Sequence, residues 1–243
     1  MFFRNMEDKE IEGIYISTRE RLTQAKRNLR NAISKSVYLS EGAISNNVVP
    51  GYNSEKLDFG AYEKDKFAVL FVDMRGSTKR AQRIGAEKTF LTMHIFISAL
   101  LQVVKYYNGY VIDIMGDGLM VFFKKDEKDE KDVINRAAFC GVDMLKTKDY
   151  VINKLLEEED IETVSIGIGI TYGDVIVTKI GISNIYDVKV FGDCVNYASK
   201  YSSGENVIKV SEEIEYGWPS KPGGKITFKF AEEDGSREVI IPR

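Results

Sequence analysis

Two aspartates stand in the sequence where a metal ion could bridge them. Asp73 closes the apolar run FAVLFVD, which is typical of a strand buried on both faces. Asp117 lies in a Gly-Asp-Gly turn between the runs YVIDIM and LMVFF, which together predict a hairpin. In a β-α-β-β order the first strand lies beside the third, so the two carboxylates can approach each other at one edge of the sheet. Like charges repel there unless a cation lies between them, so the pattern predicts a divalent metal site.

The segment that follows Asp73 suits an anion held beside such a metal. Arg75-Gly76-Ser77-Thr78 offers a flexible glycine, two hydroxyls and a run of backbone N–H groups at the start of a helix. Taken singly, Asp73 could cap that helix and Asp117 could be an ordinary turn residue, but together these features favour phosphate chemistry. The chain has neither the Walker pattern nor a Rossmann glycine fingerprint, so phosphate binding would depend on metals.

The elements around these residues follow a β-α-β-β-α-β order. Apolar spacing predicts helices over residues 86–107 and 133–145, the second resuming over 151–158. Strands are expected at 67–73, 110–115, 119–123, 163–172 and 175–181, the last two joined by a turn at Gly173-Asp174. This order predicts an α+β fold with a ferredoxin-like sheet that packs its helices on one face. Extra C-terminal strands are expected at 206–213, 226–230 and 238–241, the last two as a hairpin.

A helical extension precedes this core. Residues 11–39 carry an apolar seam and a basic face, which predicts a helix whose charged side faces solvent. Contact with a nucleic acid or a membrane surface, or support of a dimer, are the alternatives for that helix. The following stretch is rich in Gly, Asn and Ser and predicts a linker. We therefore expect an N-terminal helix and linker over residues 1–60 and one globular domain over residues 61–243.

Composition excludes several classes of protein. Of the 243 residues, 44% are hydrophobic and 29% charged, which indicates a folded globular chain. A net charge of −3 gives no global positive field for a nucleic-acid backbone. The two cysteines make neither a disulfide framework nor a zinc site, and no apolar run reaches the roughly 18 unbroken residues of a membrane span. We expect a cytoplasmic protein that binds neither nucleic acid nor membrane.

The chemistry-bearing residues lie in motifs that resemble those of the class III nucleotide cyclases. VLFVDMRGST is similar to the family's strand ending in D-[IM]-x-G-[FS]-T, IMGDGLMVFF to its G-D-x-x-M hairpin, and FGDCVNYASK to its G-[DN]-x-V-N-x-A-[SA]-[RK] segment. SIGIGITYGDVIVTKIG and IKVSEE also look like segments of the family. The resemblance covers about residues 66–214, in the family's order and spacing.

The resemblance implies a fold and an assembly. The fold would be the cyclase variant of the ferredoxin-like sheet. Two chains would form a head-to-tail homodimer with shared active sites, and each partner would cover the exposed face of the other's sheet. One chain would supply the aspartates of a site, and the other would supply its ribose-binding, phosphate-binding and base-reading residues.

By the same resemblance, Asp73, Asp117 and the backbone carbonyl of Met74 would bind two divalent cations, Mg²⁺ or Mn²⁺. One ion would activate the ribose 3′-hydroxyl of a ribonucleoside triphosphate, and the other would stabilise the leaving pyrophosphate. The product would be a 3′,5′-cyclic monophosphate.

The later motif would complete the site. Asn196 matches the asparagine that orients the ribose. Lys200 stands where the family usually has an arginine that stabilises charge on the α-phosphate, and a lysine keeps the charge but loses the bidentate fork. The family's triphosphate-binding lysine has three candidates here, which are Lys221, Lys225 and Lys229.

The base-selecting positions depart from both purine patterns. Adenylate cyclases of the family have lysine and then aspartate or threonine, and guanylate cyclases have glutamate and cysteine, whereas this sequence has Asp113 and Lys189. A carboxylate at 113 could accept from uracil N3–H or the cytosine amino group, and an ammonium at 189 could donate to O4, O2 or cytosine N3. The same pair could serve adenine in another pose, or both could be plain strand residues.

Within the family, the sequence most resembles the pyrimidine cyclases of bacterial Pycsar anti-phage systems. That implies synthesis of cUMP or cCMP during infection, with the product read by a separately encoded effector protein. We expect UTP to be the best substrate, because uracil offers an adjacent donor and acceptor to a carboxylate and an ammonium. The alternatives are a cytidylate cyclase, a purine cyclase with an unusual base pocket, and an inactive nucleotide-binding or dimerisation module.

Overall fold

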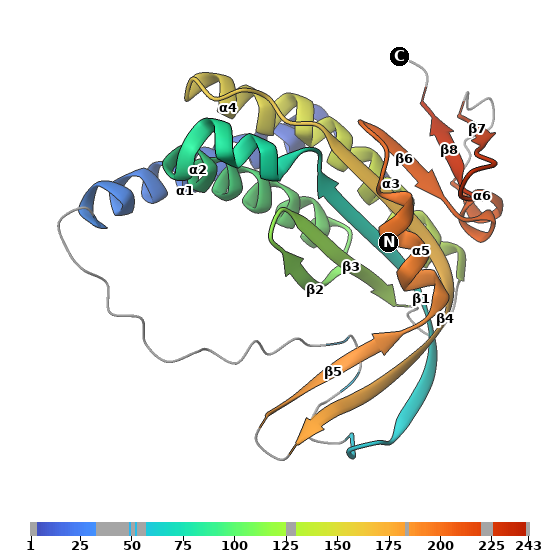
Figure 1. Cartoon of the computed structure of the whole chain (residues 1–243). Coiled ribbons are helices and arrows are strands. Elements are labelled where there is room, and N and C mark those ends of the chain that lie inside the picture. The colour runs from blue at the N-terminus through green and yellow to red at the C-terminus, as the bar shows by residue number, and fades with distance from the viewer. Residues whose placement is uncertain are drawn as a thin grey trace.

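A single mixed sheet organises the computed structural model, which describes residues 4–32, 49, 52, 57–124, 130–182, 185–219 and 226–241. The strand order is β2-β3-β1-β4-β6-β8-β7, with β5 paired to β4 (Figure 1). The strands are β1 (Tyr62–Met74), β2 (Tyr110–Met115), β3 (Gly118–Lys124), β4 (Ile166–Ile182), β5 (Ile185–Phe191), β6 (Val207–Val210), β7 (Thr227–Phe230) and β8 (Arg237–Ile240). The helices are α1 (Asp8–Ala32), α2 (Ser77–Tyr106), α3 (Glu130–Thr147), the π-helix η1 (Lys148–Asn153), α4 (Lys154–Glu158), α5 (Asp193–Tyr201) and α6 (Glu212–Gly217).

Strand β1 lies in the interior of the sheet, between β3 and β4, and most of its length is apolar on both faces. Ala68, Leu70 and Val72 alternate into the core between the sheet and the helices α2 and α3. Phe67 and Val69 point to the other face, where a smaller apolar cluster includes residues of β3, β4, β5 and α5. β1 pairs antiparallel with both β3 and β4, so the predicted β-α-β-β-α-β core and its α+β class are confirmed.

Helix α2 begins nine residues before the predicted start at residue 86, directly after the turn at Gly76. Gly85 has φ 80° and ψ 172°, which breaks the helical geometry and separates a first segment from the long apolar one. The sequence pattern captured only the second segment because this kink interrupts the periodicity. By length and composition α2 could cross a membrane, but residues such as Ile95, Phe96 and Leu100 are buried in the core.

The predicted turn at Gly173-Asp174 is wrong. β4 runs without interruption from Ile166 to Ile182, and the chain reverses only between β4 and β5. Gly173 does not have a positive φ; a Cβ there would lie 3.1 Å from Cys194 Cβ, so the glycine allows α5 to approach the sheet. The strand prediction for 206–213 is correct only for its first half, because the Ser-Glu-Glu end begins α6. The hairpin of β7 and β8 is confirmed.

The helices α3, η1 and α4 follow one another where two separate helices are predicted. Thr147 and Asn153, at the two junctions, have right-handed helical φ values of −61° and −64°. Asn153 also bonds the backbone of Val164 in both directions, through its Nδ2 and its Oδ1. These bonds tie the end of the helical run to the segment that leads into β4.

Helix α1 packs against α2, η1 and the start of the chain by its apolar side. Ile11, Ile14 and Leu22 are buried in the main core, and each large side chain of this kind contributes about 1.5 to 3 kcal/mol by leaving water. The part of the predicted helix beyond Ala32 lies outside the described residues. α1 therefore adds to the helical layer that covers one face of the sheet (Figure 1).

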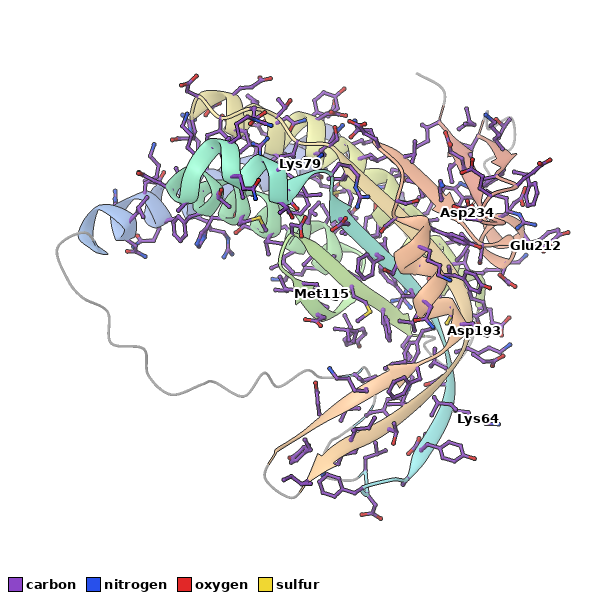
Figure 2. The ribbon with its side chains drawn as sticks, in the orientation of Figure 1. Lys64, Lys79, Met115, Asp193, Glu212 and Asp234 are labelled. Atoms are coloured by element: carbon purple, nitrogen blue, oxygen red, sulfur yellow. The ribbon has the colours of Figure 1, made fainter. Side chains whose placement is uncertain are left out.

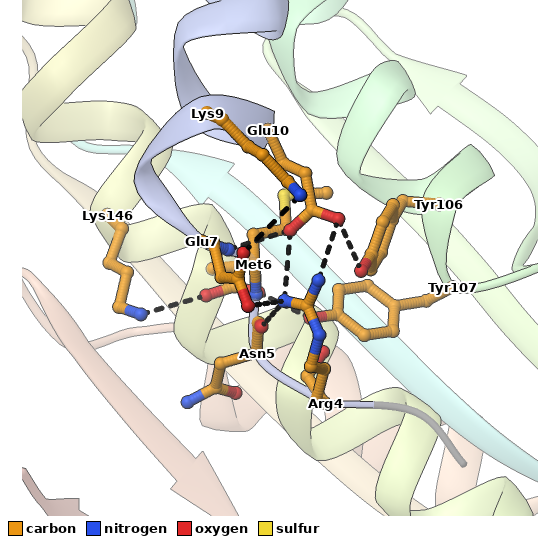
Figure 3. A network of polar contacts seen from close by, with 10 residues as sticks. Arg4, Asn5, Met6, Glu7, Lys9, Glu10, Tyr106, Tyr107 and Lys146 are labelled. Atoms are coloured by element: carbon orange, nitrogen blue, oxygen red, sulfur yellow. Dashed lines mark hydrogen bonds and ion pairs between the residues drawn. The ribbon is translucent and has the colours of Figure 1, made fainter.

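A polar network holds the beginning of α1 in place (Figure 3). Asp143 of α3 is fully buried and accepts hydrogen bonds from the Met6 N–H at 2.6 Å and from the Tyr107 hydroxyl. Burial, together with the neighbouring Asp143 carboxylate, raises the pKa of Tyr107, so this hydroxyl stays protonated and able to donate. Lys146 Nζ lies 3.3 Å from the other Asp143 oxygen. We call Met6, Tyr107, Asp143 and Lys146 the N-terminal anchor.

Candidate metal and phosphate site

The two aspartates lie at the same edge of the sheet, by which we mean the side where β1 ends and the turn from β2 to β3 begins. Asp73 of β1 is opposite Gly118 of β3, and the backbone N–H of Met74 donates to the carbonyl of Asp117 at 3.1 Å. Asp73 is also opposite Gly167 of β4, so it stands between two strands that carry no side chain beside it. A Cβ at Gly118 would lie 2.9 Å from the Val72 carbonyl oxygen and 3.3 Å from Asp73 Oδ1. The glycines of this turn therefore leave room around the carboxylate.

Arg75 occupies that room. Its guanidinium is ion-paired with the Asp73 carboxylate, and the two side chains are 25% and 31% exposed. Burial lowers the pKa of Arg75, while the charges of Asp117 and Glu205 act in the opposite direction. Among the described residues, Arg75 Nε is buried without a hydrogen-bond partner. Arg75 is thus paired with Asp73 and also feels the negative charges of Asp117 and Glu205.

The turn that follows leads straight into α2. Gly76 adopts the left-handed conformation, with φ 64° and ψ 20°, and its carbonyl accepts the first helical bond, from the Arg80 N–H at 3.0 Å. In the described part of the chain, no side chain forms a capping hydrogen bond at this end of α2. Ser77 and Thr78 occupy its first turn, where the N–H groups and the positive end of the helix dipole favour an anion.

The donor set fits hard divalent cations. Carboxylate and backbone carbonyl oxygens are the ligands that Mg²⁺ and Mn²⁺ prefer, and Asp73, Asp117 and the Met74 carbonyl offer them. In the part of the chain that the structure describes, no three His, Cys, Asp or Glu residues group closely enough to hold a metal by themselves. A metal here would need further ligands from a bound phosphate.

Asn196 and Lys200 lie one helical turn apart on the exposed side of α5. The opposite side of α5 lies directly on β4, because a Cβ at Gly169 would be 2.0 Å from the Ala198 carbonyl oxygen. Lys200 Nζ is 5.3 Å from the ring centroid of Tyr197. Among the described residues, neither Asn196 nor Lys200 forms a hydrogen bond or ion pair with Asp73, Asp117 or Arg75. Figure 2 shows where α5 begins, at Asp193.

The two predicted base-reading residues do not contact each other within this chain. Asp113 is half-buried on β2, opposite Met120 and next to an irregularity in the pairing of β2 with β3. Lys189 lies on β5, opposite Thr178, and its Nζ is 2.7 Å from Asp187 Oδ2. Its neighbours in the strand, Val188 and Val190, pack on the second apolar cluster, so Lys189 projects from the other side of β5.

Of the three lysine candidates for triphosphate binding, only Lys229 lies among the described residues. It is exposed on β7, opposite Glu238 of β8. Lys221 and Lys225 lie outside the described residues.

Sequence reasoning missed several residues that support this edge. Arg80 is buried at the start of α2 and donates to the carbonyls of Thr163, at 2.9 Å, and Glu162. Asn206, at φ 54°, accepts from buried Lys148 at 3.0 Å and bonds Ser165 and Ile166 at the start of β4. Glu205, which lies next to Asn206, contributes to the charge around Arg75. These residues come from segments far apart in the chain, so no local motif could have indicated them.

Comparison with known proteins agrees with this arrangement. The family model described as the adenylate and guanylate cyclase catalytic domain matches residues 59–229. A Staphylococcus aureus protein named cytidylate cyclase is 31% identical over 150 residues, which cover 60% of this chain and 36% of that protein. A Gulbenkiania mobilis protein named uridylate cyclase is 32% identical over 141 residues, which cover 55% of this chain and 54% of that protein. The chain thus spans between about a third and a little over half of the length of these relatives.

The fold agrees as well. The crystal structure of the adenylyl cyclase CyaB from P. aeruginosa superposes with a TM-score of 0.65 at 22% identity, over 75% of this chain and 97% of that chain. This likeness confirms the cyclase variant of the ferredoxin-like sheet that the motifs imply. With a family model that matches most of its length and a sheet of the same form, the chain belongs to the adenylate and guanylate cyclase catalytic domain family.

Proposed function

We propose that the protein is a nucleotide cyclase that converts a ribonucleoside triphosphate to a 3′,5′-cyclic monophosphate and pyrophosphate. The observation that carries this proposal is the position of Asp73 and Asp117 at one sheet edge, beside the turn at Gly76 and the uncapped start of α2. Carboxylates for metals next to N–H groups for phosphates are what an in-line phosphoryl displacement needs.

Each residue has a role in this proposal. Asp73, Asp117 and the Met74 carbonyl hold two divalent cations, which when bound lower the pKa of the 3′-hydroxyl and neutralise the triphosphate. The segment from Arg75 to Thr78 binds the phosphates through its guanidinium, hydroxyls and N–H groups. Asn196 orients the ribose, and Lys200 places its charge near the α-phosphate.

The site is shared between two chains of a homodimer. Asn196 and Lys200 are exposed on α5, and among the described residues they form no hydrogen bond or ion pair with the aspartates. In this proposal a second chain brings the two sets together. The β4–β5 ribbon, with the start of β1, extends away from the body (Figure 1). This ribbon carries exposed apolar side chains. Such a group needs a partner surface in water; its members are Tyr62, Ile176, Ile180, Ile182 and Phe191.

Uracil is the proposed base. Asp113 and Lys189 supply an acceptor and a donor in place of either purine pattern. The relatives named uridylate and cytidylate cyclases support a pyrimidine, and the choice of UTP over CTP rests on the adjacent N3–H and O4 of uracil. In this proposal the enzyme acts in the cytoplasm in anti-phage defence, and a separate effector reads its product.

The direct test is to incubate the purified full chain with Mn²⁺ and each of the four ribonucleoside triphosphates separately, and to identify the products by mass. We expect cUMP as the main product, then cCMP, with little cAMP or cGMP. Mainly cCMP would identify a cytidylate cyclase, and mainly cAMP or cGMP a purine cyclase. No cyclic product from any nucleotide, with nucleotide binding retained, would leave an inactive nucleotide-binding module.

Sharing of the site is tested by mixing two inactive variants. In a mixed dimer of Asp73→Ala and Asn196→Ala chains, one site collects both defects and the other is intact. Activity should return to as much as about half of the wild-type rate per mixed dimer, if the sites are independent. Two affinity tags establish that mixed dimers form. Mixed dimers that stay as inactive as their parents would show that each site is built within one chain.

A further inference from the structure

Arg75 and Asp73 form an ion pair beside the turn at Gly76. Only Met74 separates them, and its side chain is buried in the core on the helical side of the sheet. The left-handed Gly76 turns the chain directly after Arg75, so the guanidinium lies over the carboxylate instead of following α2. The cationic group thus contacts Asp73 Oδ2, an oxygen that the proposed function assigns to a metal.

A phosphate could replace Asp73 as the partner of Arg75. Both side chains are partly exposed, and an ion pair that water can reach contributes little to stability. Arg75 Nε has no partner, so the planar fork of the guanidinium is not fully used. A phosphate would satisfy that fork with two parallel hydrogen bonds, which a single carboxylate oxygen at this site does not.

Charge favours the same exchange. Arg75 is paired with Asp73, and the negative charges of Asp117 and Glu205 also act on it, so these four residues carry more negative than positive charge and attract cations. A divalent ion that bound Asp73 while Arg75 stayed in contact would meet strong repulsion. A metal that arrives together with a triphosphate brings a new anionic partner for Arg75 and removes that repulsion.

We propose that Arg75 is an exchangeable cation, which holds the Asp73 carboxylate until a metal–nucleotide complex arrives and then transfers to the triphosphate. Metal binding at Asp73 is thereby coupled to nucleotide binding, and free metal ions bind weakly. This inference rests on the proposed function, because it takes Asp73 as the metal ligand and a nucleoside triphosphate as the substrate.

The first test measures Mn²⁺ binding to the full chain without nucleotide, by the electron paramagnetic resonance signal of free Mn²⁺. Arg75→Gln should bind Mn²⁺ about three- to tenfold more tightly than wild type, because the competing charge is gone. Arg75→Lys keeps the charge and should stay near wild type. Arg83→Gln is the matched control, since Arg83 lies on α2 and pairs with Glu162 at 2.8 Å, away from Asp73. Unchanged or weaker Mn²⁺ binding by Arg75→Gln would overturn the proposal.

The second test measures the other half of the exchange. With EDTA present, binding of inorganic tripolyphosphate is followed by calorimetry. Arg75→Gln should weaken this binding about five- to tenfold, and Arg83→Gln should not change it. Tripolyphosphate binding that is unaffected by Arg75→Gln overturns the transfer to phosphate. Thermal unfolding checks that each variant is folded, and Arg75→Met replaces Arg75→Gln if the latter is not.

Both measurements are independent of turnover, so they separate this inference from the proposed function. If no ribonucleotide is cyclised while Mn²⁺ and tripolyphosphate binding change as stated, the exchange holds and the cyclase proposal fails. If cyclic nucleotide is formed while Arg75→Gln binds Mn²⁺ like wild type, the cyclase proposal holds and the exchange is wrong.

Discussion

Asp143 and Asp73 are aspartates in two regions of the same sheet-and-helix body, and they differ in what holds them. Asp143 is fully buried and receives hydrogen bonds from the Met6 N–H and the Tyr107 hydroxyl, which belong to the start of the chain and to the end of α2. Asp73 is 31% exposed and pairs with a side chain two residues away. The Asp143 carboxylate thus connects segments that are distant in the chain, whereas the Asp73 carboxylate pairs only with a residue of the turn that follows it.

This difference separates stability from chemistry. Removing a buried carboxylate leaves its donors unpaired in a place that water does not reach, which is costly. Removing a partly exposed carboxylate such as Asp73 allows water to hydrate its ion-pair partner, so the loss of stability is small. We give the name metal edge to the end of the sheet that carries Asp73 and Asp117, where the proposed metals would bind. We therefore expect changes at the N-terminal anchor to lower stability and changes at the metal edge to lower activity.

The largest expected effect is on turnover at the metal edge. Asp73→Ala or Asp117→Ala should lower the rate of cyclic nucleotide formation at least about a thousandfold, because the metals lose a ligand. The melting temperature should stay within a few degrees of wild type. The measurement is product formation by mass spectrometry beside thermal unfolding. A variant with near wild-type rates would refute the assignment of that carboxylate to a metal.

The next effect is on stability at the N-terminal anchor. Asp143→Ala should lower the free energy of unfolding by about 2 to 4 kcal/mol, since the buried Met6 N–H loses its acceptor and the Tyr107 hydroxyl loses its bond to the carboxylate and keeps the Arg4 carbonyl. Tyr107→Phe should cost about 1 to 2 kcal/mol, because it removes the hydroxyl that bonds Asp143 and the Arg4 carbonyl but leaves the Met6 N–H paired with Asp143. Chemical denaturation measures both.

The control for that comparison is Asp160→Asn. Asp160 is an exposed aspartate with φ 53°, a conformation that asparagine accepts, so this change should leave stability unaltered. Equal stability of Asp143→Ala and Asp160→Asn would show that the anchor contributes nothing.

The smallest effect concerns acid. Burial raises the pKa of Glu10, but hydrogen bonds from the Glu7 N–H, Arg4 and Tyr106 lower it by more, so the pKa is below its usual value in the folded chain. This stabilisation is present above the unfolded-state pKa and is lost as the pH falls through the folded-state pKa. The difference in the free energy of unfolding between wild type and Glu10→Gln should therefore shrink as the pH falls from neutral to below about 4. The change should be less than about 1 kcal/mol. A difference in melting temperature between the two proteins that is the same at every pH would argue against this contribution.

The sequence was most informative at the metal edge, because the signals there are local. An apolar strand that ends in Asp73 and a glycine-flanked Asp117 are short patterns, and chain topology alone places the first strand beside the third. The ion pair of Arg75 with Asp73 was not predicted, although the two residues are close in sequence. It depends on the left-handed turn at Gly76, which sequence permits but does not require.

The predictions of secondary structure fail at two places where contacts with a distant segment decide the structure. Gly173 was interpreted as a turn residue, but it lies within β4 and makes room for Cys194. The polar start of β1, from Tyr62 to Lys66, carries no apolar alternation, and it forms a strand only because β4 extends far enough to pair with it. In both places a distant segment decides the structure.

The glycines of β4 set the spacing between the sheet and the helix that carries Asn196 and Lys200. A methyl group at Gly167 would lie 1.9 Å from the Ser202 carbonyl oxygen, and one at Gly169 would lie 2.0 Å from that of Ala198. These contacts leave no room for a side chain between β4 and α5, so α5 is held at a fixed distance from the sheet of its own chain. A change in the alignment of the two halves of the proposed site would then require one protomer of the proposed homodimer to turn as a unit against the other.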